Sequence, residues 1–395
     1  MKFIKDPVHG DIPIDDEDLP ILDSPAVQRL RRVKQIGLGD LAYPGANHTR
    51  FEHSIGTMYL AKVLAKRLDL DHETARLLRV ASLLHDVGHG PLSHTSEKFA
   101  IANFHIDHTE MSRREITGGS TAAILESCGL DPKEVSKISC EGKNDLGLLL
   151  HSQIGIDRMD YLVRDAHYTG VAYGVIDHQR IISTMALVDG SLAVAEKGMQ
   201  AVESLLVARF LMYPTVYLHH VSRIADSMML RALEGLSQEG YSVEQIMRMD
   251  DFSLFNALRS AGGIPGTTAE RLMNRDLFKR AVYLGTGQVA DLDELIKISQ
   301  DRGKMREMED EIAEAAGLES GDVLVDIQGM PPLGEGETMI LVGSRLEPLR
   351  ARSALVASLE EARWAYWRLG VYCDRLNVDK VRRVCEEYGW SGVER

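Results

Sequence analysis

Apolar residues recur at spacings of three and four positions along most of the chain between Pro25 and about Leu284. This spacing places apolar side chains on one stripe of an α-helix, so the region is expected to be overwhelmingly helical. The runs LRRVKQIG, HSIGTMYLAKVLAKRL and ETARLLRVASLLHDV all carry the pattern. Pro214 interrupts a long apolar run, which predicts two long helices with a break or kink between them.

The two ends of the chain have a different residue pattern from this helical region. Residues 1–22 are rich in Pro and Asp and are broken by Gly10, which predicts extended segments or a hairpin. After about residue 318, GDVLVDIQ, ETMILVG and VYCDRL read as short strands, whereas SALVASLEEARWAYWRLG and DKVRRVCEEYG read as helices. We therefore predict a mainly α fold, with an extended N-terminal segment over residues 1–24, a helical bundle over 25–317 and a small C-terminal α/β lobe over 318–395.

Composition and charge exclude several classes of protein. A formal net charge of −14 argues against general nucleic-acid binding, which needs many cations facing phosphates. The four cysteines form no C-x-x-C pair, so neither thiolate zinc nor a disulfide framework is expected. No apolar run reaches the roughly 18 residues of a membrane span, and the first residues lack the apolar core of a secretion signal. We therefore expect a cytoplasmic protein that contacts no membrane.

An abrupt change from leucines to imidazoles occurs within VASLLHDVGHGPLSH, residues 80–94. The helix predicted over residues 74–87 has a wide apolar face, so His85 and Asp86 at its end are expected near the core. An unpaired charge is costly there. Either these two side chains are satisfied by neighbours at a helix end, or they bind a ligand.

Two further apolar segments add candidate metal ligands. RFEHS supplies His53 at the start of one helix, and GIDRMDYLVRD supplies Asp157 in another. With His85 and Asp86 they make a set of two nitrogens and two oxygens, which leaves positions open for water and phosphate on a divalent metal. Asp160 lies one helical turn beyond Asp157, so spacing alone leaves the choice between these two carboxylates open.

Several motifs closely resemble the HD-domain deoxynucleoside-triphosphate triphosphohydrolases. They are DPVHGDI, SPAVQRLRRVKQIG, YPGANHTRFEHSIG, LLHDVGHGPLSH, GIDRMDYLVRDAHYTG and DVLVDI, and they span nearly the whole chain. The resemblance implies an HD-domain phosphohydrolase core over 25–317, without a sterile-alpha-motif domain. It also implies metal-dependent hydrolysis of a dNTP at the α-phosphorus to deoxynucleoside and triphosphate. It places His53, His85, Asp86 and Asp157 at metal-ligand positions, for Fe, Mn, Mg, Zn, Co or Ni.

The same resemblance assigns residues that surround the nucleotide. The implied catalytic residues are Arg50, His89, Glu97 and His108, with Glu97 standing where the family tends to have Asp. The implied substrate-binding residues are Gln35, Arg50, His94, Arg158, Tyr161, Asp165, Arg209, Tyr217 and His219. A histidine that titrates near neutrality can protonate the departing sugar oxygen, and arginines neutralise phosphates. The alternatives are surface histidines at 94 and 108 and an exposed helix charge at 209.

The N-terminal segment resembles a regulatory nucleotide site of the same family. Lys2, Asp23, Gln28 and Arg31 match positions that bind an activating guanine nucleotide, GTP or dGTP, between subunits. A homo-oligomer, dimer or tetramer, is therefore implied; the alternative is that this segment only packs against the helical body. The connector MPPLGEGE, residues 330–337, lacks the basic residues of a second phosphate clamp.

Two other functions stay open on the sequence alone. The same metal centre could serve a phosphohydrolase or phosphodiesterase that acts on another nucleotide and releases orthophosphate. The chain could instead be a nucleotide-sensing oligomer, although the presence of every expected ligand argues against an inactive protein.

Overall fold

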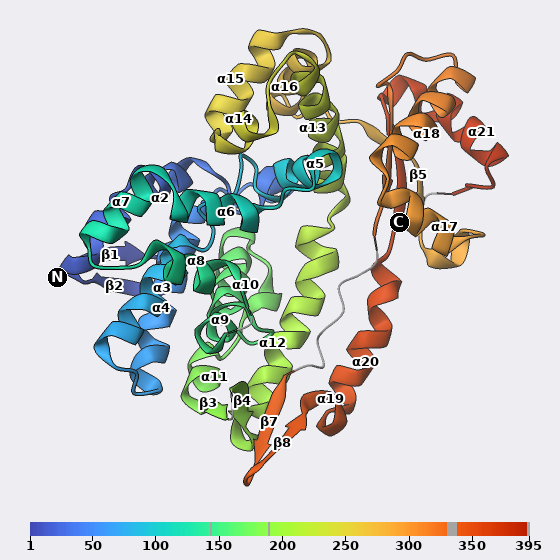
Figure 1. Ribbon diagram of the computed structural model, residues 1–395. Helices are drawn as coiled ribbons and strands as arrows, with labels where there is room; N and C mark the ends of the chain where they lie inside the picture. The colour runs from blue at the N-terminus through green and yellow to red at the C-terminus, as the bar shows by residue number, and fades with distance from the viewer. Residues whose placement is uncertain (143, 189, 330–337, 393–395) are drawn as a thin grey trace.

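Helices dominate the computed structural model, which describes residues 1–142, 144–188, 190–329 and 338–392 (Figure 1). The mainly α fold is therefore confirmed. The connector 330–337 lies outside the described residues. The helices of the body are α1 (Leu19–Leu22), α2 (Pro25–Arg29), α3 (Arg50–Arg67), α4 (His72–Leu84), α5 (His94–Phe104), α6 (His108–Thr117), α7 (Gly119–Ser127), α8 (Pro132–Cys140), α9 (Asp145–His151), α10 (Ile156–Thr169), α11 (His178–Thr184), α12 (Met199–Met212), α13 (His220–Gln238), α14 (Val243–Arg248), α15 (Asp251–Ala261) and α16 (Gly263–Met273).

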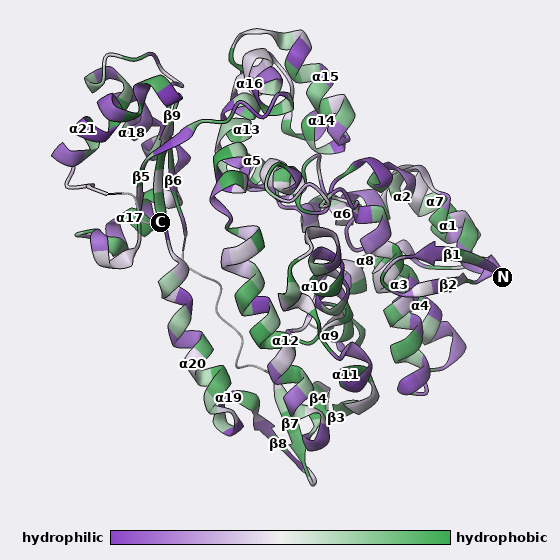
Figure 2. Ribbon diagram, turned by 180° about the vertical axis from the view of Figure 1, so that it is seen from behind, coloured by the Kyte–Doolittle hydropathy of each residue, from purple (hydrophilic) through white to green (hydrophobic). Residues whose placement is uncertain are grey.

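The apolar stripes of these helices pack against one another. α4 and α10 both pack against α3, and Leu64, Leu78 and Leu162 from the three helices share one fully buried cluster. Burying one such side chain contributes about 1.5–3 kcal/mol. In Figure 2 hydrophilic and hydrophobic residues alternate along α4, as an amphipathic helix requires. The central three helices are therefore held at fixed separations by their core faces.

The N-terminal segment forms a hairpin, one of the two conformations predicted for it. β1 (Lys2–Asp6) and β2 (Gly10–Ile14) pair antiparallel. Gly10 in the turn has φ +77°, a left-handed conformation that glycine adopts without strain. Ile12 and Ile14 are fully buried, so β2 fixes the hairpin to the body.

Pro214 lies at the break that the sequence predicts. A five-residue π-helical turn, η6 (Tyr213–Tyr217), separates α12 from α13. The two helical stretches Glu196–Tyr217 and His220–Gln238 meet at 60°. Proline has no backbone N–H and cannot continue the α-helical hydrogen-bond ladder, which accounts for the break. Among the described residues no single helix is long and apolar enough to cross a membrane, and only this bent pair meets the criteria of length and composition.

The C-terminal lobe is built on an antiparallel sheet of strand order β5-β9-β6. Its helices α17, α18 and α21 pack against the sheet. β5 corrects the prediction of helix up to residue 284: the segment KRAVYL is a strand, and it precedes residue 318, the expected start of the lobe. The elements are β5 (Lys279–Leu284), α17 (Leu292–Ser299), α18 (Arg302–Ala315), β6 (Val323–Ile327), β9 (Leu369–Cys373) and α21 (Val378–Glu387).

A second sheet of order β3-β4-β7-β8 lies at the end of the body remote from the lobe (Figure 1). β3 (Met185–Val188) and β4 (Ser191–Ala195) lie within the region predicted to be helical, which is a second correction. β7 (Met339–Val342) pairs parallel with β4 and antiparallel with β8 (Arg345–Pro348). Two helices, α19 (Leu349–Arg352) and α20 (Ala354–Ala362), then lead back toward the lobe.

Candidate functional site

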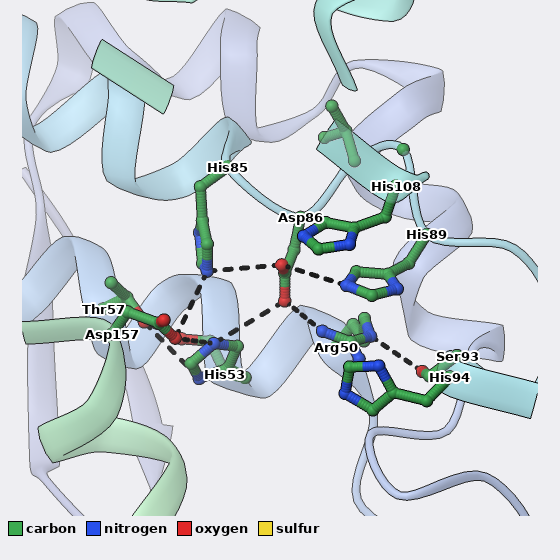
Figure 3. Close-up of polar contacts among 12 residues, drawn as sticks. Arg50, His53, Thr57, His85, Asp86, His89, Ser93, His94, His108 and Asp157 are labelled. Atoms are coloured by element: carbon green, nitrogen blue, oxygen red, sulfur yellow. Dashed lines mark hydrogen bonds and ion pairs between the residues drawn. The ribbon is translucent and has the colours of Figure 1, made fainter. Parts of the chain in front are cut away.

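The ends of three core helices bring two imidazoles and two carboxylates together, and Figure 3 shows these side chains pointing toward one another. His53 lies in the first turns of α3, which begins with a capping box completed by Glu52. His85 and Asp86 follow the end of α4. Asp157 lies in the first turn of α10. The cluster is therefore built on rigid elements rather than on a long loop.

Ligand atoms of His53, His85 and Asp157 lie within 4.8 Å of one another, and Asp86 contacts both histidines from one side. His53 Nε2 lies 3.1 Å from Asp157 Oδ1 and 3.6 Å from Asp86 Oδ2. His85 Nε2 lies 3.4 Å from Asp86 Oδ1 and 3.6 Å from Asp157 Oδ1. This His85 nitrogen is buried and has no hydrogen-bond partner in the described part of the chain. A buried imidazole nitrogen that faces two carboxylates without a hydrogen bond fits a ligand of a divalent cation.

Electrostatics keep the two carboxylates ionised. Burial by itself raises the pKa of Asp157, but His53 and His85 hold it far below its usual range. Burial also raises the pKa of Asp86, and the Arg50 guanidinium holds it well below its usual range. Burial lowers the pKa of His53, but hydrogen bonds to neighbouring carboxylates, Asp157 first, raise it to about 10. A cation bound here would compete with a proton on His53 Nε2.

Asp160, the alternative ligand by spacing, lies behind His53 rather than in the cluster. Its Oδ2 is 2.8 Å from His53 Nδ1, and its two oxygens accept from Arg164 at 2.9 and 3.0 Å. Its Oδ1 is also 2.6 Å from Nε2 of His9. The structure thus brings Asp157 to the cluster instead. The sequence gives no role to His9, although its position in the DPVHGDI motif is a signal.

A second group of side chains suits proton transfer. His108 Nδ1 bonds to Glu97 Oε1, and His94 Nδ1 lies 2.8 Å from Glu97 Oε2. The rings of His108 and His89 stack at 4.1 Å, and His89 Nε2 lies 3.5 Å from Asp86 Oδ1. Burial by itself lowers the pKa of His108, but Glu97 raises it above the ordinary value. Burial and nearby positive charges lower the pKa of His89 well below its ordinary value. The two stacked imidazoles therefore have pKa values shifted in opposite directions, upward for His108 and downward for His89.

Arg50 is tied to the cluster itself. Its Nη1 lies 2.5 Å from Asp86 Oδ2, and its Nε donates to Ser93 Oγ at 2.7 Å. Its Nη2 is buried and has no hydrogen-bond partner among the residues that the structure describes. A buried guanidinium nitrogen with an unused donor beside these carboxylates can receive a phosphoryl oxygen.

Two further arginines converge on one neutral acceptor. Arg209 Nη1 donates to Gln153 Oε1 at 2.9 Å, and Arg158 Nη1 donates to the same oxygen. Arg209 is 6 % exposed, which excludes the alternative of an exposed helix charge. Its guanidinium also lies 5.6 Å from the centroid of the Tyr213 ring. Both guanidinium groups therefore lie against one amide oxygen. Gln153 carries no motif signal, so the sequence does not reveal it.

The expected sugar contacts form a connected group. Asp165 Oδ2 accepts from the Tyr217 hydroxyl at 2.8 Å, and Asp165 Oδ1 lies 2.7 Å from His48 Nε2. The Tyr217 ring lies 6.4 Å from that of Tyr161, whose ring lies 6.4 Å from that of His53. These side chains therefore form a connected group that extends from the cluster of candidate metal ligands. His48 contacts Asp165, but it is not among the substrate-binding candidates inferred from the sequence.

Gln35 and His219 have no hydrogen bond or ion pair to the cluster among the described residues. Gln35 is buried, and its backbone N–H donates to the carbonyl of His48 at 3.0 Å. His219 precedes α13, where its Nδ1 accepts from the N–H of Val221 at 3.3 Å. Its ring lies 5.5 Å from that of Tyr43.

The structure brings together two of the four candidate regulatory residues. Arg31 Nε donates to Gln28 Oε1 at 2.8 Å, and the Arg31 guanidinium lies 3.5 Å from the centroid of the Phe51 ring. Lys2 and Asp23 are exposed. Across the described ranges, no hydrogen bond or ion pair joins them to Gln28 or Arg31.

Comparison with known proteins finds relatives over the whole chain. An uncharacterised protein of Methanocaldococcus jannaschii is 33 % identical over 387 residues, which cover 97 % of this chain and 81 % of that protein. The deoxynucleoside triphosphate triphosphohydrolase SAMHD1 homolog of Dictyostelium discoideum is 29 % identical over 263 residues, 60 % of this chain and 50 % of that protein. The solved structure of a phosphohydrolase from Bacteroides thetaiotaomicron is 26 % identical with a TM-score of 0.75, and the match covers 95 % of this chain and 100 % of that one.

Two family models divide the chain between them. The HD domain matches residues 50–163, which include all four candidate metal ligands. The HD associated region matches residues 176–388, more than half of the chain. These matches and the SAMHD1 relative confirm the resemblance inferred from the motifs. The chain therefore belongs to the HD-domain family with an HD associated region, and it is a metal-dependent phosphohydrolase.

Proposed function

We propose that the protein hydrolyses deoxynucleoside triphosphates at the α-phosphorus and releases deoxynucleoside and triphosphate. The observation that carries the proposal is the cluster of four candidate ligands linked, through Asp86, to both the Arg50 guanidinium and the stacked histidine pair. The proposed ligands are His53, His85, Asp86 and Asp157. A divalent metal held there would lower the pKa of a bound water and polarise a phosphoryl oxygen.

The arginines are proposed to bind the triphosphate. Arg50 has one unused buried donor next to Asp86, and Arg158 and Arg209 share the Gln153 oxygen. Phosphoryl transfer depends mainly on positioning and on stabilising charge at the phosphoryl oxygens, which these guanidinium groups supply.

His108 is the proposed proton donor. When the bond between the α-phosphorus and O5′ breaks, the sugar oxygen must take up a proton, and the oxygen of the consumed water stays on the triphosphate. Glu97 raises the pKa of His108, which favours its protonated form, whereas the pKa of the stacked His89 is lowered. Asp165 and Tyr217, whose side chains bond to each other, are proposed to contact the deoxyribose.

Product analysis tests the proposal. The protein is incubated with each dNTP and NTP, with Mn²⁺ or Mg²⁺, and the products are separated by chromatography. We expect deoxynucleoside and triphosphate in equal amounts. Release of orthophosphate would contradict the proposal and favour the second candidate, a phosphohydrolase or phosphodiesterase acting on another nucleotide. An Asp157→Ala variant should lose both metal and turnover.

A guanine-nucleotide activator and a homo-oligomer are the less direct part of the proposal. They rest on the resemblance at Lys2, Asp23, Gln28 and Arg31, and on the dNTP hydrolase named among the relatives. Analytical ultracentrifugation and turnover with and without GTP test both. If neither the oligomeric state nor the turnover rate changes with GTP, the proposal of a guanine-nucleotide activator is wrong. Assembly that persists in Asp157→Ala together with no turnover in the wild type would favour a nucleotide sensor.

A further inference from the structure

His9 is a residue of a surface hairpin whose side chain is nevertheless only 1 % exposed. It lies in the turn between β1 and β2. Asp6 shapes this turn, because its Oδ1 accepts from the backbone N–H groups of Val8 and His9 at 2.9 and 2.8 Å. The His9 ring then packs against Tyr59 at 5.2 Å and edge-on against His178 at 5.7 Å. A buried imidazole needs a hydrogen-bond partner.

That partner is Asp160, which is 151 residues away in the sequence. His9 Nε2 lies 2.6 Å from Asp160 Oδ1, and His53 Nδ1 lies 2.8 Å from Asp160 Oδ2. Asp160 itself is fully buried. One carboxylate therefore joins the hairpin turn to a candidate metal ligand.

Arg164 is also a partner of Asp160. Its Nε and Nη2 donate to the two Asp160 oxygens at 2.9 and 3.0 Å, and its Nη1 donates to Asp6 at 2.7 Å. This guanidinium is shared between two carboxylates, and His9 adds a further donor to Oδ1 of Asp160. Its contribution is geometric: a donor on Oδ1 fixes the carboxylate plane so that Oδ2 faces His53.

The orientation of His53 decides what its other nitrogen can do. A hydrogen bond from Nδ1–H to Asp160 leaves the Nε2 lone pair directed toward Asp157 and His85. We propose that His9 is a positioning residue of the metal centre, which fixes the His53 imidazole in its metal-binding orientation through Asp160. This inference rests on the proposed ligand role of His53 and is independent of which nucleotide is the substrate.

The affinity for Co²⁺, measured by competition with a chelator and without nucleotide, tests the inference. His9→Phe keeps an aromatic ring against Tyr59 but removes the donor, and it should weaken Co²⁺ binding about 10- to 100-fold. His9→Gln can place an amide N–H near the position of Nε2 and should restore most of the affinity. His178→Ala is the matched control, because this ring packs on His9 but has no hydrogen bond to Asp160 in the described structure. It should bind Co²⁺ like the wild type.

The absorption bands of bound Co²⁺ give a second readout, because they report ligand geometry. At saturating Co²⁺ they should shift in His9→Phe and not in His9→Gln, with circular dichroism as the check of the fold. Should His9→Phe not fold, His9→Asn replaces it, since the shorter amide does not reach Asp160. Wild-type affinity in the donor-free variant, or an equal loss in His178→Ala, would overturn the inference. A wild-type protein that binds Co²⁺ but hydrolyses no dNTP would contradict the proposed substrate alone.

Discussion

Glu97 controls the acid–base behaviour of the site because it bonds to two histidines at once. Its two oxygens contact His108 and His94, so the extra methylene relative to Asp does not prevent either contact. Glu97 raises the pKa of His108 against the opposing effect of burial. His108 therefore stays protonated to a higher pH than an ordinary imidazole, and proton donation is lost as the pH rises through this raised pKa.

The pH profile of kcat should consequently change in Glu97→Gln. Without the carboxylate, burial lowers the pKa of His108, so the alkaline limb should move to lower pH. Above this limb kcat should fall by about 100-fold, the usual scale of general acid catalysis. His94→Ala leaves the bond between Glu97 and His108 intact and should keep the limb in place. A limb that does not move in Glu97→Gln would rule out His108 as the proton donor.

Arg209 should affect substrate binding more than the chemical step. Loss of a hydrogen bond to a charged group costs about 1.5–3 kcal/mol, so Arg209→Ala should raise KM for the triphosphate about 10- to 100-fold. Co²⁺ affinity should stay unchanged, because among the described residues the hydrogen bond of Arg209 goes to Gln153, which is not a candidate ligand. Arg114→Ala, which removes an exposed arginine of α6, is the control and should leave KM unaltered. Steady-state kinetics give KM for both variants, and an unchanged KM in Arg209→Ala would contradict its role in binding phosphate.

A site residue could be predicted from the sequence only where its neighbours in the chain indicate its role. Asp86 follows His85 directly, but this pair alone left open a satisfied helix end, and only its combination with His53 and a later carboxylate indicated a metal. Spacing could not separate Asp157 from Asp160, because both lie near the start of one helix, and only the packing of α10 on α3 decides which faces His85. The partnership of His9 with Asp160 is a tertiary contact that no local pattern encodes.

At the scale of elements, α3 and α10 approach closely at Gly56. A Cβ at this position would lie 1.9 Å from Asp160 Oδ1 and 2.4 Å from Arg164 Nη2. Alanine is favoured over glycine in a helix by about 1 kcal/mol, yet Gly56→Ala should destabilise the protein, because overpacking costs about 1–3 kcal/mol or more and disturbs a buried ion pair. Urea unfolding measures the free energy.

A helical glycine with room provides the control. A Cβ at Gly266 in α16 would meet its nearest atom at 3.5 Å, an ordinary contact. Gly266→Ala should therefore be neutral or stabilise by about 0.4–1 kcal/mol. If Gly56→Ala were equally harmless, the close approach of the two helices would not constrain the site.

The helices were easier to predict than the sheets, because a helix is set by residues three and four apart whereas a sheet joins distant segments. GDVLVDIQ and ETMILVG both form strands, as predicted, but β6 pairs with β9 and β7 pairs with β4. β5 and the pair β3–β4 were missed within a region of helical periodicity. Their short apolar runs fit a buried helix segment equally well.

At the scale of the whole molecule, largely buried ion pairs join the helical body to the C-terminal lobe, among them Arg223 with Asp326 and Arg302 with Glu234. Arg223 of α13 donates through Nε to Asp326 Oδ2 of β6 at 2.6 Å and through Nη2 to Asp326 Oδ1. The hydroxyl of Tyr372 in β9 also donates to Asp326 at 3.0 Å. The side chains of the pair are 9 % and 16 % exposed. The contact therefore fixes the central sheet of the lobe against α13, and through it against the body that carries the site.

Removing one partner of this pair should cost more than removing both. Arg223→Ala leaves Asp326 largely buried without its charge partner, and the free energy of unfolding should fall by about 3–5 kcal/mol. The double variant Arg223→Met with Asp326→Leu removes both charges and should lose less. Arg352→Ala breaks the exposed pair with Glu196 and should cost at most about 1 kcal/mol. Urea denaturation of the three variants measures these free energies. A cost of Arg223→Ala no greater than that of Arg352→Ala would mean that the Arg223–Asp326 pair does not stabilise the contact between lobe and body.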